Sequence, residues 1–110
     1  MKLKSLVFCT SLLALSSAAV ADTDFAKVNE ALQKNNCLAC HAVDNKLVGP
    51  SYVEVAEANK GDPANAEKLR NAIKNGIGGV WGPIPMPPNP QVSDDDLTLI
   101  VDWLMAGAPH

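Results

Sequence analysis

The sequence predicts a small all-α domain of four or five helices. Apolar residues recur at intervals of three and four in several segments, which is the pattern of a helix with one buried face. Capping residues precede these segments, and no run alternates apolar and polar residues as a half-buried strand does. Loops rich in glycine and proline separate the segments, chiefly 44–50 and 75–92. The second loop is long for so small a domain, and such loops usually carry function.

Three helices are expected before the long loop. The first spans 24–33, where the apolar residues form one stripe. The second spans 51–59 and has Ser51 as its cap. The third spans 62–75: an Asp-Pro pair supplies a cap and then a proline at the first helical position, and Gly76 follows its last residue.

The last helix has the clearest signals. Ser93 is its expected cap, and the three aspartates that follow face the positive end of the helix dipole. Ser93 and Asp96 have the spacing of a capping box, and Gly107 ends the helix. The expected buried face consists of Leu97, Ile100, Val101, Leu104 and Met105.

Residues 1–21 have the features of a cleaved signal peptide. Two lysines precede a short apolar run, and the segment ends in Ala-Val-Ala, a pattern of small residues typical of a signal-peptidase site. A membrane anchor is the alternative, but the apolar run is too short to span a bilayer. We therefore expect export to the periplasm, loss of Cys9 with the signal peptide, and a mature domain of residues 22–110.

The mature domain is acidic. It keeps seven of the nine cationic residues and all twelve carboxylates, which gives a net charge of −5. Nucleic-acid binding requires clustered cations that neutralise phosphates, so this balance argues against it and against docking on anionic lipid. We expect a soluble protein without membrane insertion.

Residues 37–41 read CLACH, the attachment pattern of a c-type haem. Residues three apart on a helical turn face the same way, so the Cys37 and Cys40 thiols can both reach the vinyl groups of one porphyrin. His41 then lies under the iron and can be an axial ligand. The expected cofactor is one covalent haem c, which also gives a small domain an apolar plate to pack around.

Three other interpretations fit parts of this motif. A thioredoxin-like dithiol also uses C-x-x-C, but it expects βαβ neighbours. A structural zinc site needs four ligands, whereas the mature chain offers only Cys37, Cys40, His41 and His110. A plain disulfide between the two cysteines would close a very small loop and stabilise little.

The candidates for a sixth iron ligand are Met86, Met105 and His110. Met105 belongs to the apolar stripe of the last helix, and His110 is the final residue of the sequence. Met86 lies in WGPIPMPPNP, where prolines on both sides stiffen the loop and leave the thioether little entropy to lose. Met86 is the expected distal ligand.

Two segments, CLACHAVDNKLVGP at 37–50 and IKNGIGGVWGPIPMPPN at 73–89, resemble bacterial class I cytochromes c of the c-551 (c8) group. The resemblance implies an all-helical fold wrapped around one covalent haem. It also implies thioether bonds at Cys37 and Cys40, axial ligation by His41 and Met86, and a Pro50 carbonyl that orients the proximal imidazole.

The resemblance extends to residues around the haem. It implies that Trp81 donates to a haem propionate and that Asn89 forms a hydrogen bond near the methionine sulfur. Ala72 departs from the family, which often has a cation there, and Arg70 is expected to point elsewhere. Asn36 stands where glycine is common, which predicts a left-handed backbone.

We therefore expect an electron carrier and not an enzyme. A His/Met pair leaves the iron no vacant position, so the haem passes single electrons. By resemblance, the donor is a membrane quinol-oxidising complex, and nitrite reductase, cytochrome c peroxidase or a terminal oxidase are the acceptors. The alternative is a five-coordinate haem protein that binds gas or has peroxidase-like activity. A further alternative is a docked subunit of one larger complex.

Redox partners are expected to dock transiently on a monomer, through a small interface at the haem edge. The expected apolar patch comprises Val48, Ile84, Pro87 and Pro88. The expected cationic rim, which would steer an acidic partner, comprises Lys34, Lys46 and Lys74.

Overall fold

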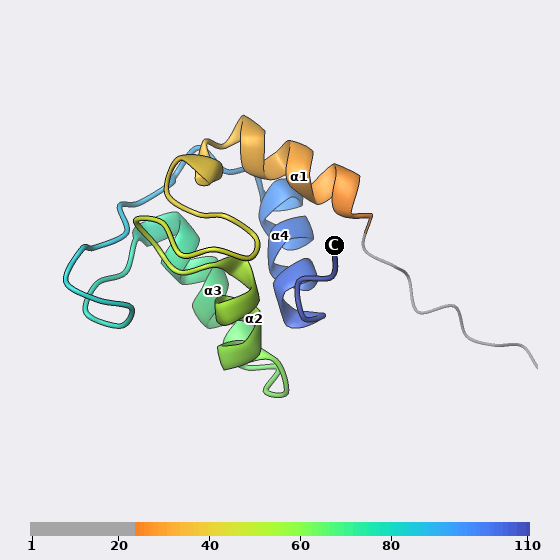
Figure 1. The fold of residues 1–110 in the computed structure, drawn as a ribbon. Helices are drawn as coiled ribbons and strands as arrows, with labels where there is room; N and C mark the ends of the chain where they lie inside the picture. Colours follow the sequence, from red (N-terminus) through yellow and green to blue (C-terminus); the bar gives the residue numbers. More distant parts are fainter. Residues whose placement is uncertain (1–23) are drawn as a thin grey trace, which may run out of the picture.

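The last helix, α4 (Asp94–Met105), is the element against which the other three α-helices pack. These are α1 (Phe25–Lys34), α2 (Tyr52–Asn59) and α3 (Asn65–Asn75), and Figure 1 shows them arranged around α4. A short 3-10 turn, η1 (Cys37–Ala39), follows α1. Three helix ends adjoin the loops that carry the candidate site. They are the last turn of α1, the first turn of α2 and the last turn of α3.

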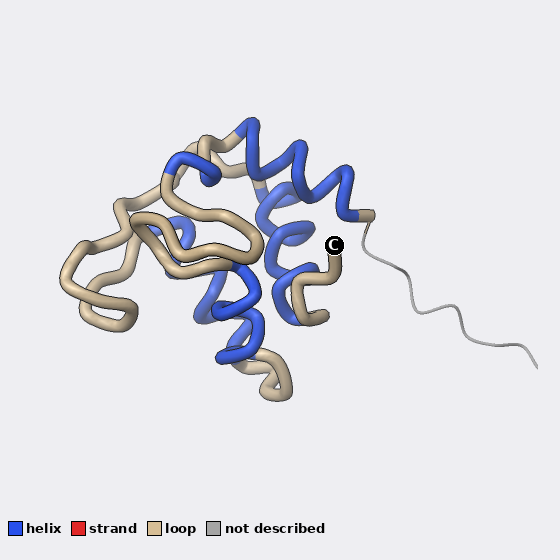
Figure 2. Tube along the Cα trace, viewed as in Figure 1, coloured by secondary structure: helices blue, strands red, loops and turns tan. Residues whose placement is uncertain are grey.

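The structure is a computed structural model that describes residues 24–110; the expected signal peptide, 1–21, lies outside the described residues. Within that range the regular structure is helical, as Figure 2 shows. The only β-type pairing there is an isolated bridge between Ile77 and Met86. The all-α prediction is confirmed. No helix in this part of the chain has the length and apolar character needed to cross a bilayer.

Trp103 lies at the centre of the core. It is fully buried, and its ring packs edge-on against Tyr52 of α2, with centroids 5.4 Å apart, and at a tilt of 33° against Phe25 of α1, with centroids 5.8 Å apart. The indole N–H donates to the Pro109 carbonyl at 2.8 Å, which satisfies its one polar group. The sequence pattern did not predict this position as buried, whereas Met105, which it did, is only partly buried. Because three helices surround α4, its buried face is wider than one stripe.

Most of the expected helix ends are confirmed. Ser51 and Glu54 form a complete capping box at the start of α2. At the end of α4, the N–H groups of Gly107 and Ala108 donate to carbonyls of the last turn in the pattern of a Schellman motif. The expected start of the third helix at residue 62 is wrong: Asp62 accepts the N–H of Ala64 in a preceding turn, and α3 begins at Asn65.

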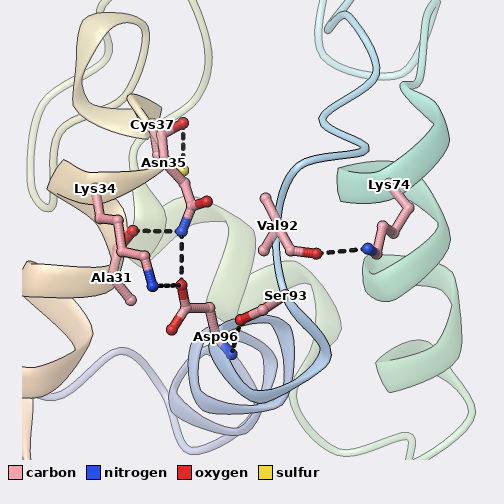
Figure 3. A network of polar contacts seen from close by, with 8 residues as sticks. All are labelled: Ala31, Lys34, Asn35, Cys37, Lys74, Val92, Ser93 and Asp96. Atoms are coloured by element: carbon pink, nitrogen blue, oxygen red, sulfur yellow. Dashed lines mark hydrogen bonds and ion pairs between the residues drawn. The ribbon is translucent and has the colours of Figure 1, made fainter.

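The expected capping box at the start of α4 forms only in part. The N–H of Asp96 donates to Ser93 Oγ at 3.1 Å, but the Asp96 carboxylate turns toward α1. There it accepts Asn35 Nδ2 at 3.0 Å and pairs with Lys34 Nζ at 3.2 Å (Figure 3). Asn35 is buried and also donates to the Ala31 carbonyl. This network fixes the C-terminal end of α1 just before the CLACH motif.

Replacing Asp96 by Asn is expected to lower the free energy of unfolding at neutral pH by about 1 kcal/mol, the usual net contribution of one intramolecular hydrogen bond. Asn35 and Lys34 hold the pKa of Asp96 below its ordinary value. A carboxylate with a lowered pKa stabilises the fold above the pKa of the unfolded chain, about 4, and this stabilisation is lost as the pH falls further. The difference from wild type should therefore disappear in acid. Denaturant titrations at several pH values measure it, with Asp95→Asn in the same turn as the control; equal effects of both variants would contradict the role of the network.

Candidate haem-binding site

The CLACH motif forms one tight turn. Asn36 has φ 60° and ψ 25°, so the predicted left-handed backbone is confirmed. The N–H groups of Cys40 and His41 both donate to the Cys37 carbonyl, at 3.2 and 3.1 Å. Both cysteines are free thiols and form no disulfide in the structure. The turn thus presents two thiols and an imidazole from five consecutive residues.

The His41 imidazole is held on several sides. Its Nδ1 lies 2.7 Å from the Pro50 carbonyl, and because a carbonyl only accepts, Nδ1 carries a proton and Nε2 is the nitrogen left to bind a metal. Residues 24–110 supply no hydrogen-bond partner for Nε2. The Tyr52 ring packs beside the imidazole, with centroids 5.0 Å apart. A Cβ on Gly49 would lie 2.5 Å from His41 Cε1, so only glycine fits there.

Tyr52 also reaches the first cysteine. Burial raises the pKa of the Cys37 thiol, and a hydrogen bond with Tyr52 opposes this shift in part. Burial, together with Cys37, raises the pKa of the Tyr52 hydroxyl. Before the haem is attached, the Cys37 thiol and the Tyr52 hydroxyl therefore both stay protonated at neutral pH. Sequence analysis missed Gly49 and Tyr52, because their roles depend on packing against His41; the Gly-Pro pair at 49–50 was the one available signal.

Met86 lies in the long loop, where its backbone is fixed. Its N–H donates to the Ile77 carbonyl at 2.8 Å and its carbonyl accepts the Ile77 N–H at 3.1 Å. The Asn89 side chain donates to the carbonyls of Ile73 and Pro87, at 3.2 and 3.1 Å. Both of these Asn89 partners are backbone carbonyls, and neither is the sulfur of Met86.

The other candidate ligands are engaged elsewhere. Met105 packs at the edge of a buried cluster that contains Val101. His110 pairs with Asp44 through Nε2 at 3.0 Å, and its Nδ1 contacts the Ala108 carbonyl at 2.9 Å. Among the described residues, Met86 is therefore the one methionine that lies in a loop, whereas Met105 packs against the helical core.

The expectation for Arg70 is confirmed. Its guanidinium donates to Thr98 Oγ1 of α4 at 2.9 Å, so it turns away from Ala72 and does not replace the missing cation there. Trp81 is 39% exposed in the long loop. It borders a hollow of about 410 Å³ whose other walls come from α2, chiefly Val53 and Glu57.

The exposed apolar side chains fit a haem. All large apolar side chains that the described range leaves exposed fall in two segments, 47–53 and 77–84; they are Leu47, Val48, Val53, Ile77, Val80, Trp81 and Ile84. These segments adjoin the residues that fix His41 and Met86. Val53 and Trp81 line one hollow, so the two segments meet there, and apolar surface gathered in this way usually marks a place that another group covers. A large, flat, apolar cofactor joined to the CLACH turn can cover it.

Residues 24–110 do not show the features of a zinc site, a thioredoxin-like dithiol or a disulfide, which are the three alternatives to haem. They bring together no group of three or more His, Cys, Asp or Glu side chains that could hold a metal ion. They contain no βαβ unit of the kind a thioredoxin-like dithiol requires. The two cysteines remain unpaired thiols.

Comparisons with known proteins identify the family. The family model described as "Cytochrome C oxidase, cbb3-type, subunit III" matches residues 24–104. The chain is 46% identical to cytochrome c-551 of Stutzerimonas stutzeri, over 86% of this chain and 91% of that protein. It is 47% identical to cytochrome c-551 of Pseudomonas aeruginosa, over 79% of this chain and 84% of that protein.

A solved structure gives the same result for the fold. The crystal structure of Nitrosomonas europaea cytochrome c552 superposes with a TM-score of 0.68 at 44% identity, covering 71% of this chain and 96% of that one. The helices of the described region and the CxxCH motif at 37–41 are therefore those of a known class. The chain belongs to the cytochrome c-551 group of class I cytochromes c: it is an electron-carrying cytochrome with a covalently attached c-type haem.

Proposed function

We propose that the mature chain, residues 22–110, is a periplasmic one-electron carrier whose haem iron is bound by His41 and Met86, with thioether bonds at Cys37 and Cys40. The observation that carries the proposal is that hydrogen bonds hold both proposed ligands, His41 and Met86, in place. The Pro50 carbonyl occupies Nδ1 of His41 and leaves Nε2 free, and the backbone of Met86 is paired on both sides with Ile77.

The haem supplies the one-electron chemistry when bound, and a His/Met pair favours a high reduction potential. The residues of the chain hold the two ligands in place and keep substrates and water away from the haem. Since both axial positions would be filled from fixed loops, no position remains for a substrate. The exposed apolar segments would be covered by the cofactor, which keeps water from its faces. This arrangement supports a carrier rather than an enzyme.

Two residues are proposed to tune the site. Trp81 is proposed to donate its indole N–H to a propionate, which its position beside the hollow and its exposure support. Asn89 is proposed to act near the Met86 sulfur. Its hydrogen bonds to Ile73 and Pro87 support this indirectly, because they fix the chain just after Met86.

Export and partners follow from the same proposal. Residues 1–21 would direct the chain to the periplasm and be removed. There it would take electrons from a membrane quinol-oxidising complex and pass them to a reductase or oxidase, for example nitrite reductase or cytochrome c peroxidase. Pro87 and Pro88 are exposed and lie outside the two segments that the cofactor would cover, which supports a transient apolar contact there, with the parts of Val48 and Ile84 left at the haem edge.

The absorption spectrum with carbon monoxide tests the ligation. We expect the oxidised protein to show the far-red charge-transfer band of sulfur ligation, and the reduced protein to ignore carbon monoxide. Met86→Leu should abolish the band and allow carbon monoxide to bind, because the substitution removes the sulfur with little change in volume. Met105→Leu is the matched control and should leave both properties unchanged. A wild-type protein without the band that binds carbon monoxide would contradict the proposal and favour a five-coordinate, gas-binding or peroxidase-like haem protein.

Lys46 is the rim lysine most available for steering. Lys34 is paired with Asp96, and Lys74 donates to the Val92 carbonyl, whereas Lys46 is exposed in the loop 44–50. We expect Lys46→Glu to slow oxidation by an anionic iron complex about threefold at low ionic strength, with the rates converging as salt screens the charge.

The control for this prediction is Lys68→Glu, which makes the same charge change at an exposed position of α3. Stopped-flow rates over a range of ionic strength measure both variants. If the two slow the reaction equally, the effect comes from net charge, and Lys46 has no place in a docking rim.

A further inference from the structure

We infer that Gly76 is a positioning residue for the distal ligand: it lets the end of α3 lie directly against the Met86 carbonyl, so that the backbone pair of Ile77 and Met86 can close the ligand loop. The inference rests on the proposed ligation by Met86. Gly76 has no contact with the reacting group, and it acts through the backbone of the ligand.

The first step is the backbone pair itself. Ile77 and Met86 exchange two N–H to carbonyl hydrogen bonds, at 3.1 and 2.8 Å, and form the isolated antiparallel bridge of the structure. The bridge uses both backbone polar groups of Met86. It also encloses the loop 78–85, and no residue of that loop makes a backbone hydrogen bond to another part of residues 24–110. The bridge is therefore the main constraint on where the Met86 side chain begins.

The second step is the space beside Met86. A Cβ placed on Gly76 would lie 2.6 Å from the Met86 carbonyl oxygen, 3.0 Å from Pro88 N and 3.2 Å from the Pro87 carbonyl carbon. All three are backbone atoms, so none can rotate away as the end of a side chain does. The carbonyl oxygen is the one that accepts the Ile77 N–H. A larger residue at 76 would push directly on the bridge.

The third step is the conformation of Gly76. It has φ 80° and ψ 165°, a region populated almost only by glycine. Its N–H still donates to the Ala72 carbonyl at 2.9 Å and ends α3. Gly76 therefore ends α3, turns the chain and leaves room for the Met86 carbonyl.

The fourth step links this contact to the core. The Asn89 N–H and Nδ2 both donate to the Ile73 carbonyl in the last turn of α3, so the chain on the far side of Met86 is tied to the same helix end. Lys74 of that turn donates to the Val92 carbonyl near the start of α4. The distal ligand is thus connected to the helical core through a few backbone groups around Gly76.

Gly76→Ala and Gly79→Ala test the inference as a matched pair. Gly79 lies in the same loop with φ 76°, but a Cβ there would meet nothing within 4 Å. Both variants introduce a residue at positive φ, and only Gly76→Ala presses on Met86. The measurement is the affinity of the oxidised holoprotein for added imidazole, which competes with the sixth ligand.

We expect Gly76→Ala to bind imidazole at least about tenfold more tightly than Gly79→Ala, the factor that corresponds to about 1.4 kcal/mol. Its far-red band should be weaker at the same helix content by circular dichroism. Equal imidazole affinities and equal bands in the two variants would overturn the inference. If the ligation proposal itself is wrong, the experiment gives a different result: wild type would lack the band, and Met86→Leu would not alter imidazole binding.

Amide hydrogen exchange in wild type provides the test if Gly76→Ala does not fold. Coupling between two sites is reciprocal, so displacing Met86 with saturating imidazole should speed exchange at the Ile77 and Met86 amides. The Gly76 amide, bonded within the end of α3, is the internal reference and should change less. Unchanged protection of the Ile77 and Met86 amides would overturn the inference by this route too.

Discussion

The rest of the structure depends on the packing of three helices against α4, with Trp103 at the centre. Each of these helices delivers one part of the site from one of its ends. The C-terminal end of α1, fixed through Asn35 and Asp96, leads into the CLACH turn. The first residue of α2, Tyr52, packs on His41, and the last turn of α3 holds the backbone of Met86. Long loops can therefore present ligands in fixed positions because their anchoring residues belong to a packed core.

The same core is too small to bury all the apolar side chains of the chain. A domain of this size buries a modest fraction of its surface, and the two loops keep several large apolar side chains exposed. A covalent haem between the loops would serve as part of the core as well as the redox group. This explains why the close approaches in the site involve glycine: Gly49 admits the His41 ring and Gly76 admits the Met86 carbonyl. Both ligands are positioned by backbone that leaves no room for a side chain.

Local signals in the sequence predicted what is local in the structure. The CLACH spacing, the left-handed Asn36 and the caps at Ser51 and Gly107 involve residues a few positions apart, and the structure bears them out. Apart from the start of α3, the errors concern contacts between different segments. Asp96 completes no capping box in α4 because Asn35, at the end of α1, is its partner instead. The role of Trp103 depends on Tyr52, and that of Gly76 depends on Met86, which no local pattern connects to it. Such tertiary contacts leave no periodic pattern that a single sequence can reveal.

The central claim is that Met86 is the distal ligand, and proton NMR of the reduced holoprotein with methyl-labelled methionine tests it most directly. A methyl group held over the porphyrin face experiences a large upfield ring-current shift, whereas one in a helical core does not. Residues 22–110 contain two methionines, Met86 and Met105. We predict one strongly upfield-shifted methionine methyl signal that disappears in Met86→Leu and persists in Met105→Leu. A spectrum without such a signal, or one in which it disappears with Met105, would contradict the account.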